Sequence, residues 1–200
     1  MPSYFLQILL WLAYGVLHSV LADNKVKRFF EQKMGRGYRR YRLLYNLQAL
    51  VFLVLILVYQ LTLPVERIWD YDWRIHLVGN ILKYGGLLIV LIAISGYDFK
   101  EFSGLTFSPR NASAGSGTLK TTGLLHYVRH PIYTGTLLFV WGLFVEEASI
   151  RNLIMAVCIT VYVRIGIVFE ERKLIAEFGK NYLEYRRRVP MLFPNFYNRR

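Results

Sequence analysis

The sequence contains long runs of apolar residues that carry no formal charge. Residues 3–22 and 43–63 are two such runs, and residues 77–97 form a third that is interrupted only by Lys83. At about 1.5 Å per residue, a helix over each run matches a hydrocarbon core roughly 30 Å thick. The runs therefore predict an all-α, polytopic integral membrane protein.

Two further segments complete a predicted set of five transmembrane helices. Residues 123–145 and residues 149–169 are mostly apolar, although basic side chains interrupt both of them. Charged groups at membrane depth are costly, so these interruptions need a structural or functional reason. The alternative is four full spans plus a re-entrant or interfacial piece near residues 98–131.

The distribution of Lys and Arg predicts how the helices are oriented. Eight of the 25 basic residues lie in residues 23–42, three in residues 98–122 and eight in residues 172–200, whereas three flank the spans on the opposite side. Basic loops resist translocation across the membrane. We therefore expect the amino terminus outside the cell and the carboxyl terminus in the cytoplasm.

The net charge of +12 does not by itself indicate a nucleic-acid partner. Membrane topology and attraction to anionic lipid headgroups explain the basic residues. Cys158, the single cysteine, lies in an apolar run, which excludes an intramolecular disulfide framework and a multi-cysteine metal site. We expect membrane lipids as partners, no nucleic acid and no metal, and the oligomeric state stays open.

A polar motif interrupts the fourth predicted span. On a helix, His126, Arg129, His130 and Tyr133 lie at positions i, i+3, i+4 and i+7, which places them on one face. Pro131 lacks an N–H donor and disfavours helix at the residue before it, so a kink or a new helix start is expected there. Exposed backbone groups beside these side chains would form a pocket. The alternative is an interfacial belt in which the Arg and Tyr side chains reach toward the headgroups.

Two adjacent carboxylates, Glu170 and Glu171, follow the fifth predicted span. Acidic side chains are unfavourable at the carboxyl end of a helix, so either the helix continues or a cation lies nearby. If the helix continues, Glu171, Phe178, Tyr182 and Tyr185 share one face. The cation would be either a neighbouring Arg or Lys side chain or the ammonium group of a bound ligand.

In this order the two clusters resemble a known family. An Arg-His-Pro-x-Tyr motif at residues 129–133 opens one span, Glu-Glu-x-x-Leu at residues 170–174 ends the next, and Phe-Gly-x-x-Tyr-x-x-Tyr follows at residues 178–185. Over about residues 118–194 the chain is similar to the isoprenylcysteine carboxyl methyltransferase superfamily. That superfamily also includes phospholipid and small-thiol methyltransferases.

The amino-terminal half resembles a narrower branch, the methanethiol S-methyltransferase-like and NnrU-like membrane proteins. The motifs of this second resemblance lie at residues 17–22, 41–46 and 97–105. Together the two resemblances imply one transmembrane domain over residues 1–200. Residues 1–97 would form three spans on the substrate side, and residues 98–200 would form a cytoplasmic segment followed by a two-helix methyltransferase core with the cofactor pocket.

The resemblance implies S-adenosylmethionine as the methyl donor, bound on the cytoplasmic side, and S-adenosylhomocysteine as the product. One glutamate of the pair would hold the ammonium group of the cofactor and a basic group its carboxylate. Aromatic side chains would line the adenosine pocket and cover the sulfonium. The cofactor-binding residues implied in this way are Thr118, Leu119, Lys120, Leu125, Arg129, His130, Pro131, Tyr133, Glu170, Glu171, Tyr182 and Tyr185.

Departures from the family pattern bear on the methyl acceptor. The carboxyl methyltransferases have a His upstream and an aromatic residue two positions after the glycine, where this chain has Gly117 and Leu125. Their substrate-holding arginine corresponds here to Gly166, with Arg164 the nearest guanidinium. These differences disfavour a prenylcysteine carboxylate as the substrate. We expect a small thiol or a lipid-like acceptor instead.

A third polar cluster lies near the cytoplasmic end of the first span. Ser19 follows His18, and Tyr45 and Asn46 lie at the start of the second span. If the acceptor is a thiol, His18 is the candidate base for its proton, with Arg42 or Asn46 nearby to orient the substrate. The alternative is a structural role, because a lone histidine in a membrane helix is usually a hydrogen-bonded part of the packing.

Two other functions are compatible with the same motifs. Sterol-reductase-like enzymes that use NADPH share the Arg-His-Pro motif, but they place Asn after the proline and Glu after a downstream glycine, where this chain has Ile132 and Thr136. The glutamate pair suits an ammonium group better. A non-enzymatic transporter or scaffold would use these residues as contacts between helices and would bind no nucleotide cofactor.

Overall fold

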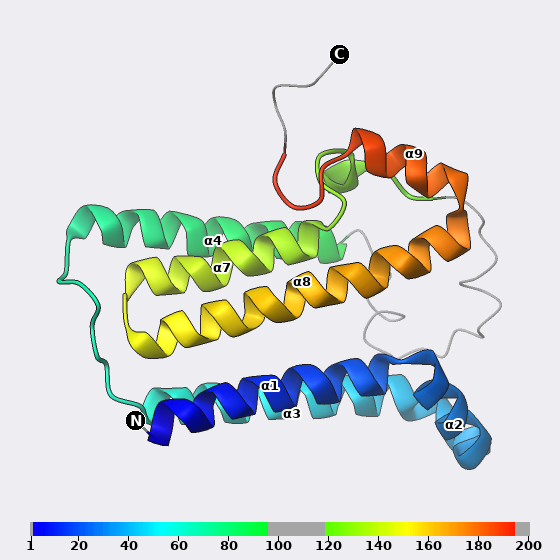
Figure 1. The fold of residues 1–200 in the computed structure, drawn as a ribbon, viewed down its shortest axis with the longest axis horizontal. Helices are drawn as coiled ribbons and strands as arrows, with labels where there is room; N and C mark the ends of the chain where they lie inside the picture. The colour runs from blue at the N-terminus through cyan, green and yellow to red at the C-terminus, as the bar shows by residue number, and fades with distance from the viewer. Residues whose placement is uncertain (1, 96–118, 195–200) are drawn as a thin grey trace.

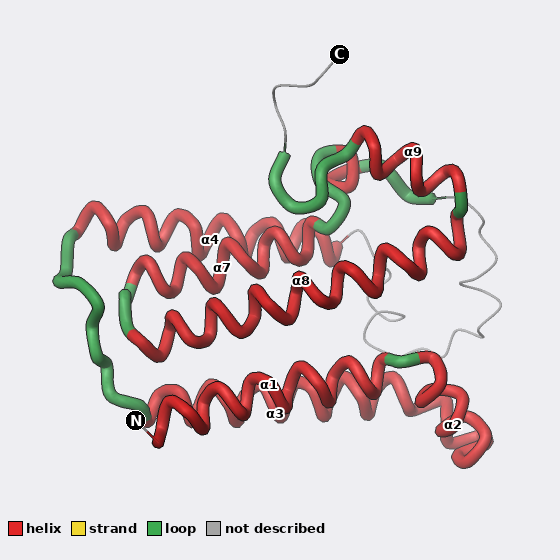
Figure 2. Tube along the Cα trace, viewed as in Figure 1, coloured by secondary structure: helices red, strands yellow, loops and turns green. Residues whose placement is uncertain are grey.

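The computed structural model describes residues 2–95 and 119–194, and this part of the chain is almost entirely helical (Figure 2). An isolated bridge between Arg67 and Ser149 is its one β-type pairing. The helices are α1 (Pro2–Ala22), α2 (Asn24–Met34), η1 (Gly35–Arg40), α3 (Tyr41–Thr62), α4 (Trp73–Ser95), η2 (Gly123–His126), α7 (Pro131–Glu146), α8 (Ile150–Phe178) and α9 (Lys180–Arg188). The all-α prediction is confirmed.

Four of the described helices, α1, α3, α4 and α8, are long and apolar enough to cross a membrane, and α7 is a shorter apolar helix. The predicted helix from residue 123 is wrong. Residues 123–126 form a 3₁₀ turn in which Gly123 has a φ of +65°, and α7 begins only at Pro131. Its 16 residues span about 24 Å. The described residues thus contain four full spans and one shorter apolar helix, and the alternative of a re-entrant piece near residues 98–131 falls largely outside the described residues.

The late start of α7 also corrects a predicted geometry. Because residues 127–130 lie outside a helix, His126, Arg129, His130 and Tyr133 do not form a continuous helical face. His130 is the N-cap, with a φ of −128° and a ψ of 66°, and Pro131 follows as the first helical residue. Proline tolerates that position because the N–H it lacks would have no partner there. The predicted new helix start at Pro131 is confirmed.

Helix α8 continues nine residues beyond the predicted end at residue 169, so Glu170 and Glu171 lie inside it. The helix ends where Gly179 adopts a φ of +55°, a conformation that L side chains rarely take. The chain then turns into α9, which carries Tyr182 and Tyr185. The predicted common helical face of Glu171 and these two tyrosines is therefore wrong, and any contact between them arises from tertiary packing.

The helices are arranged with α8 between two pairs (Figure 1). On one side α1 packs on α3 and on α8, and on the other side α4 packs on α7, which also contacts α8. Helices α4 and α7 pack most closely of these pairs, because glycines face each other across their contact. A Cβ added to Gly86 would lie 2.5 Å from the carbonyl oxygen of Gly135, and one added to Gly142 would lie 2.4 Å from the backbone nitrogen of Lys83. Small residues of this kind let membrane helices approach closely.

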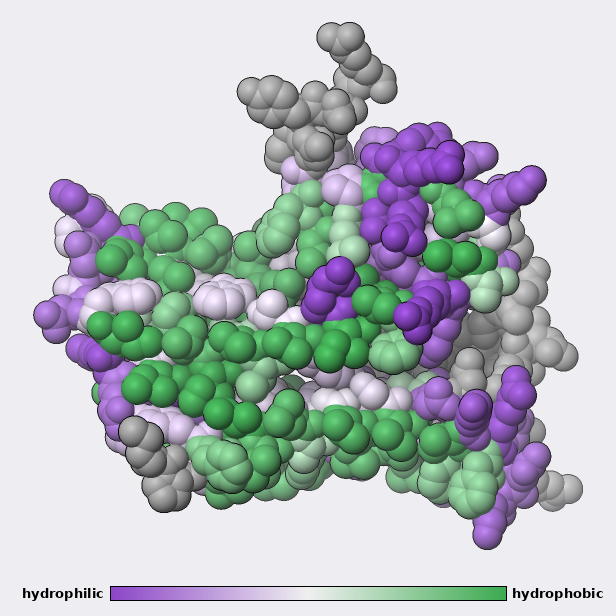
Figure 3. Space-filling model, viewed as in Figure 1, coloured by the Kyte–Doolittle hydropathy of each residue, from purple (hydrophilic) through white to green (hydrophobic). Residues whose placement is uncertain are grey.

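The molecule presents an apolar belt with polar groups at its two ends (Figure 3). This surface and the four spanning helices identify an integral membrane protein. Helices α2 and α9 lie at one end, and the loop of residues 63–72 lies at the other with the turn between α7 and α8 (Figure 1). The two most basic segments of the sequence are thus brought to the same end.

Candidate functional site

The start of α7 is held in place by the segment that follows α9. The backbone N–H of Arg129 donates to the carbonyl of Pro190 at 2.9 Å, and that of His130 donates to the carbonyl of Met191 at 3.1 Å. One turn into α7, the Thr134 hydroxyl donates to the carbonyl of Leu192 at 2.6 Å. Two segments about 60 residues apart in sequence therefore form one unit at the end of the bundle.

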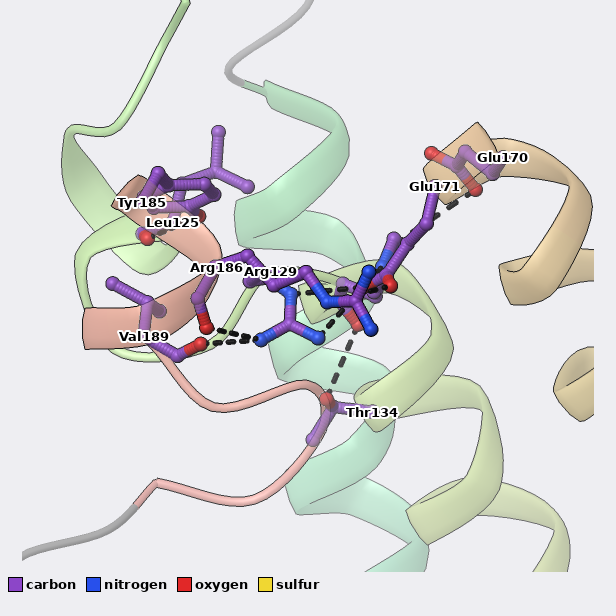
Figure 4. A network of polar contacts seen from close by, with 9 residues as sticks. Leu125, Arg129, Thr134, Glu170, Glu171, Tyr185, Arg186 and Val189 are labelled. Carbon is purple, nitrogen blue, oxygen red and sulfur yellow. Dashed lines mark hydrogen bonds and ion pairs between the residues drawn. The ribbon is translucent and has the colours of Figure 1, made fainter. Parts of the chain in front are cut away.

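Arg129 lies at the centre of this unit (Figure 4). Its Nε and Nη2 donate to the same carboxylate oxygen, Glu171 Oε1, at 2.9 and 2.6 Å. Its Nη1 donates to the carbonyl oxygens of Val189 at 2.6 Å and Arg186 at 3.1 Å. The Arg129 side chain is 6% exposed and the Glu171 side chain 8% exposed. A buried ion pair of this kind is stable only when further hydrogen bonds complete it, as they do here.

Glu171 has two further partners. His130 Nε2 lies 3.3 Å from Oε1, and because an ionised carboxylate only accepts, the ring nitrogen is the donor. Arg186 Nε lies 3.5 Å from Oε2. Glu171 thus joins α7, α8 and α9 through three cationic or donor side chains.

The neighbouring Glu170 lies in a different environment. Its side chain is 44% exposed, and Oε2 lies 3.9 Å from His130 Nδ1. The Tyr133 hydroxyl lies within electrostatic range of the Glu170 carboxylate. Glu170 therefore keeps acceptor capacity at the surface of the cluster, whereas Glu171 is fully engaged within it.

The two predicted tyrosines of α9 reach the same region. The Tyr185 hydroxyl donates to the carbonyl of Leu125 at 2.6 Å, which ties α9 to the turn before α7. Tyr182 is 1% exposed, and its hydroxyl has no hydrogen-bond partner among the described residues. Burial and the negative charge of Glu171 raise the pKa of Tyr182 to about 12. The centroids of the Tyr182 and Tyr185 rings lie 5.9 Å apart.

The predicted cofactor segment before the turn is described only in part. Leu119 is half-buried and Lys120 is exposed, in the coil that leads to η2. Thr118 lies outside the described residues. No described contact ties Leu119 or Lys120 to the Arg129–Glu171 pair.

The predicted acceptor cluster assembles around His18. The Tyr45 hydroxyl lies 2.7 Å from His18 Nε2. The Tyr14 ring stacks on the imidazole with centroids 5.8 Å apart, and the Tyr162 ring meets its edge at 6.0 Å. Asn46 is half-buried one residue after Tyr45, and the Arg42 side chain lies outside the described part of the structure.

The two clusters are connected through α8. Tyr162, Gly166 and Glu170 lie at i, i+4 and i+8 on one face of that helix. A Cβ on Gly166 would lie 3.9 Å from the Tyr133 hydroxyl, and that hydroxyl is within electrostatic range of those of Tyr162 and Tyr45. A continuous set of polar and aromatic groups thus runs from His18 to His130.

Three residues of this arrangement were not among the predicted site residues: Tyr14, Tyr162 and Arg186. Tyr162 could have been predicted from the sequence, because its helical spacing from Glu170 places both residues on one face. No local pattern distinguishes Arg186 from the basic residues next to it. Its role depends on the turn at Gly179 that brings α9 back to Glu171.

Comparisons with known proteins relate the whole chain to methyltransferases. A sequence profile described as Phospholipid methyltransferase matches residues 75–181. The methanethiol S-methyltransferase of Pseudomonas deceptionensis is 28% identical over 198 residues, which cover 96% of this chain and 73% of the relative. Methanethiol S-methyltransferase 2 of Bradyrhizobium diazoefficiens is 31% identical over 208 residues, which cover 99% of this chain and 76% of the relative.

A further relative matches about half of the chain. The protein-S-isoprenylcysteine O-methyltransferase of Schizosaccharomyces pombe is 32% identical over 98 residues, which cover 48% of this chain and 39% of the relative. No solved structure matches the chain.

Proposed function

The chain belongs to the phospholipid methyltransferase family, and from this premise we propose that it transfers a methyl group from S-adenosylmethionine to a small thiol. The protein is a membrane methyltransferase, so the NADPH reductase and the non-enzymatic carrier are the less supported alternatives. Relatives that match nearly the full chain are named for methanethiol, whereas the prenylcysteine enzyme matches about half of it. This difference supports a small thiol as the acceptor.

One observation in the structure supports the cofactor most directly. Of two adjacent glutamates, Glu171 is neutralised by Arg129, and Glu170 remains accessible beside His130 and Tyr133. An accessible carboxylate in a cluster whose internal charges are already paired suits the ammonium group of an amino-acid-like ligand. We therefore assign Glu170, rather than Glu171, as the residue that holds the cofactor.

The remaining residues of the cluster fit the other parts of S-adenosylmethionine. Arg129 already makes four hydrogen bonds, so the cofactor carboxylate needs another basic group or a backbone donor, and Lys120 is the predicted residue nearest in sequence. The buried Tyr182 hydroxyl has a free donor, and Tyr133 offers an aromatic face. Leu125 would contribute an apolar contact to the adenine.

On the acceptor side, we assign His18 as the base that takes the thiol proton. The Tyr45 hydroxyl hydrogen-bonds to Nε2 of His18, and the rings of Tyr14 and Tyr162 pack against the imidazole. These contacts orient His18 and would exclude water from it. When bound, the cofactor supplies an electrophilic methyl group, and displacement at that carbon requires the thiol sulfur in line with it. Arg42 and Asn46 stay candidates for orienting the acceptor.

The test combines ligand binding with product detection on the detergent-purified full chain. Calorimetry with S-adenosylhomocysteine is expected to show saturable binding that Glu170→Gln weakens by about tenfold, because a charge-assisted contact is lost. NADPH serves as the comparator. Glu177→Gln, an exposed glutamate further along α8, is the matched control and should bind as the wild type does.

Headspace gas chromatography then tests the acceptor, with dimethyl sulfide as the product expected from methanethiol. His18→Gln should lower kcat by about 100-fold without weakening S-adenosylhomocysteine binding, because it removes the base alone. Tyr45→Phe should lower kcat less and should shift the pH profile of the reaction. Binding of the cofactor with methylation of a lipid or a prenylcysteine but no thiol would overturn the acceptor assignment. Tight binding by Glu170→Gln would overturn the role of Glu170.

A further inference from the structure

A cavity lies at the end of the bundle opposite to the Arg129–Glu171 pair. It measures about 660 Å³, which is within the range of small-molecule sites. Its walls come from the ends of α3 and α7, the starts of α4 and α8, and the loop of residues 63–72. Figure 1 shows this loop crossing between α3 and α4 at that end.

Hydrogen bonds to the turn between α7 and α8 hold the loop of residues 63–72 in place beside the cavity. The backbone N–H of Ile68 donates to the carbonyl of Ala148 at 2.7 Å, and that of Ile150 donates to the carbonyl of Glu66 at 3.1 Å. Trp69, which lines the cavity, meets the ring of Phe144 edge-on at 5.3 Å. The cavity is thus bounded by ordered backbone contacts rather than by a loose connection.

The inner wall of the cavity is polar although it lies within an apolar bundle. Gln60 and Asn152, both buried, line it and are joined by a hydrogen bond of 3.0 Å. Arg151 also lines it and donates to Glu147 at 2.9 Å, yet its Nε is buried without a partner among the described residues. This wall therefore has a donor to offer to a ligand.

Both signs of charge line the cavity, with acidic groups in excess. The lining acids are Asp70, Asp72, Glu146 and Glu147, and the lining bases are Arg67, Arg151 and His76. Only part of this charge is internally paired. Arg151 pairs with Glu147, and Lys83 pairs with Glu146 from outside the lining. The surplus of carboxylates favours a cationic group in the ligand, and Arg67 can meet an anionic group beside it.

Part of the cavity lining is apolar and comes from exposed residues of the spanning helices. Leu61 is 74% exposed, and Leu57 and Ile75 are also exposed, on the spanning helices α3 and α4. Trp69 and Tyr71, which also line the cavity, are the residue types that prefer the membrane interface. An amphiphile with a charged head and an apolar tail matches this combination, whereas a water-soluble ion matches the polar wall alone.

We propose that this cavity binds a zwitterionic phospholipid with an amine-bearing headgroup, such as phosphatidylethanolamine. The ammonium would lie near the carboxylates of Asp70 and Asp72, which line the cavity and have no ion pair among the described residues, the phosphate near Arg67, and an acyl chain along Leu57 and Leu61. This lipid is not the proposed methyl acceptor, because His130 precedes α7 and Glu170 lies near the end of α8, whereas the end of α7 and the start of α8 line the cavity. The proposal does not depend on which compound is methylated.

Native mass spectrometry of the detergent-purified full chain tests the proposal. The protein is mixed with equal amounts of phosphatidylethanolamine and phosphatidylglycerol of the same acyl composition, and the bound lipids are weighed. We expect preferential retention of phosphatidylethanolamine. The double change Asp70→Asn with Asp72→Asn should lower that retention by at least about fivefold, because the contacts to the ammonium are lost. Arg67→Gln should lower it as well.

Matched controls separate this site from general lipid adhesion. Glu177→Gln with Glu184→Gln makes the same charge change as the double variant, and Lys180→Gln the same as Arg67→Gln, at the opposite end of the molecule, and both should leave lipid retention unchanged. Leu61→Trp fills part of the apolar lining of the cavity without altering any charge and should also lower the retention of phosphatidylethanolamine. Far-ultraviolet circular dichroism confirms that each variant is folded.

Three results would overturn the proposal: equal or greater retention of phosphatidylglycerol, unchanged retention in the double variant, or displacement of the lipid by millimolar phosphoethanolamine. The last result would mean that the cavity recognises a soluble amine and not a lipid.

Discussion

Glu170 and Glu171 are adjacent in the sequence, yet their environments assign them different tasks. Glu171 is buried against Arg129, His130 and Arg186, and Glu170 faces outward beside His130 and Tyr133. Adjacent residues on a helix point about 100° apart, so one can face the packed interior while the next faces a ligand. Glu171 is a structural connection between three segments, and Glu170 is the proposed ligand-binding group.

Removal of the buried carboxylate tests this division. Glu171→Ala leaves the Arg129 guanidinium buried without its counter-charge, so we expect a loss of about 3–5 kcal/mol in the free energy of unfolding. Thermal unfolding in detergent measures the change. Glu184→Ala, which breaks an exposed pair with Arg188, should cost less than about 1 kcal/mol. Equal losses in the two variants would contradict the structural role of Glu171.

The buried hydroxyl of Tyr182 makes a prediction about alkaline pH. Its pKa is raised from the ordinary 10.0 to about 12 in the folded protein by burial and by the Glu171 charge. The folded protein therefore retains a proton between about pH 10 and pH 12 that the unfolded chain has released. The stabilisation from the neutral hydroxyl is complete below about pH 10 and is lost as the pH rises toward 12.

Tyr182→Phe removes this group. We expect unfolding temperatures at pH 8 to be equal to or above those of the wild type, because an unpartnered buried hydroxyl is removed. Between pH 10 and pH 11 the stability of the variant should fall less steeply. Tyr71→Phe, a change of an exposed tyrosine at the opposite end, provides the baseline. Parallel decline of the wild type and Tyr182→Phe would show that another group governs the alkaline loss.

Among the helices, the α4–α7 pair depends most on residues that lack a side chain. Gly79 and Gly86 on α4 face Gly142 and Gly135 on α7, and a spacing of seven residues on each helix keeps each pair on one line of contact. This contact allows the short helix α7 to lie flush against the full span α4. It thereby sets the position of Pro131 and the polar groups before it.

An alanine at this contact should separate the two helices. The Cβ of Gly135→Ala would lie 2.6 Å from the carbonyl oxygen of Gly86, so the backbones must move apart, and we expect a loss of about 1–3 kcal/mol. Gly85→Ala meets nothing within 4 Å and should be neutral or stabilising by up to about 1 kcal/mol, because alanine favours helix. Thermal unfolding of both variants in detergent gives the comparison. A neutral Gly135→Ala would show that the helices are less closely packed than the structure indicates.

For the molecule as a whole, the basic segments gather at one end, and the orientation inferred from charge stays a prediction that this arrangement makes testable. The basic helices α2 and α9 lie at one end, with the start of α7 and the ends of α1 and α8, and the loop of residues 63–72 lies at the other end (Figure 1). With basic residues retained in the cytoplasm, the proposed catalytic site would open to the cytoplasm. S-Adenosylmethionine would be available there, and the lipid cavity would face the opposite leaflet.

Single-cysteine labelling of intact cells tests this orientation. In a Cys158→Ala background, Asp70→Cys in the loop should react with a membrane-impermeant maleimide, and Lys27→Cys in α2 should react only after the membrane is opened. Reaction of both positions in solubilised protein is the control for accessibility. The reverse pattern in intact cells would overturn the orientation.

Most of the fold follows from local pattern. Apolar runs of spanning length place α1, α3 and α4, because burial of side chains in lipid requires only that neighbours along the chain be apolar. The break at Pro131 follows from the missing N–H donor, and the family follows from the ordered motifs at residues 129–133, 170–174 and 178–185. Each of these inferences uses properties of residues close together in the sequence.

The errors lie where contacts between distant segments outweigh local preference. The sequence near Gly123 does not predict that residues 127–130 form a coil. The hydrogen bonds that stabilise this coil are accepted by the carbonyls of residues 190 and 191. The division of labour between Glu170 and Glu171 depends on Arg129, more than 40 residues away, and on Arg186 beyond the turn at Gly179. Partners that meet only when the chain is packed determine charge pairing, burial and the site, so these features become visible only in three dimensions.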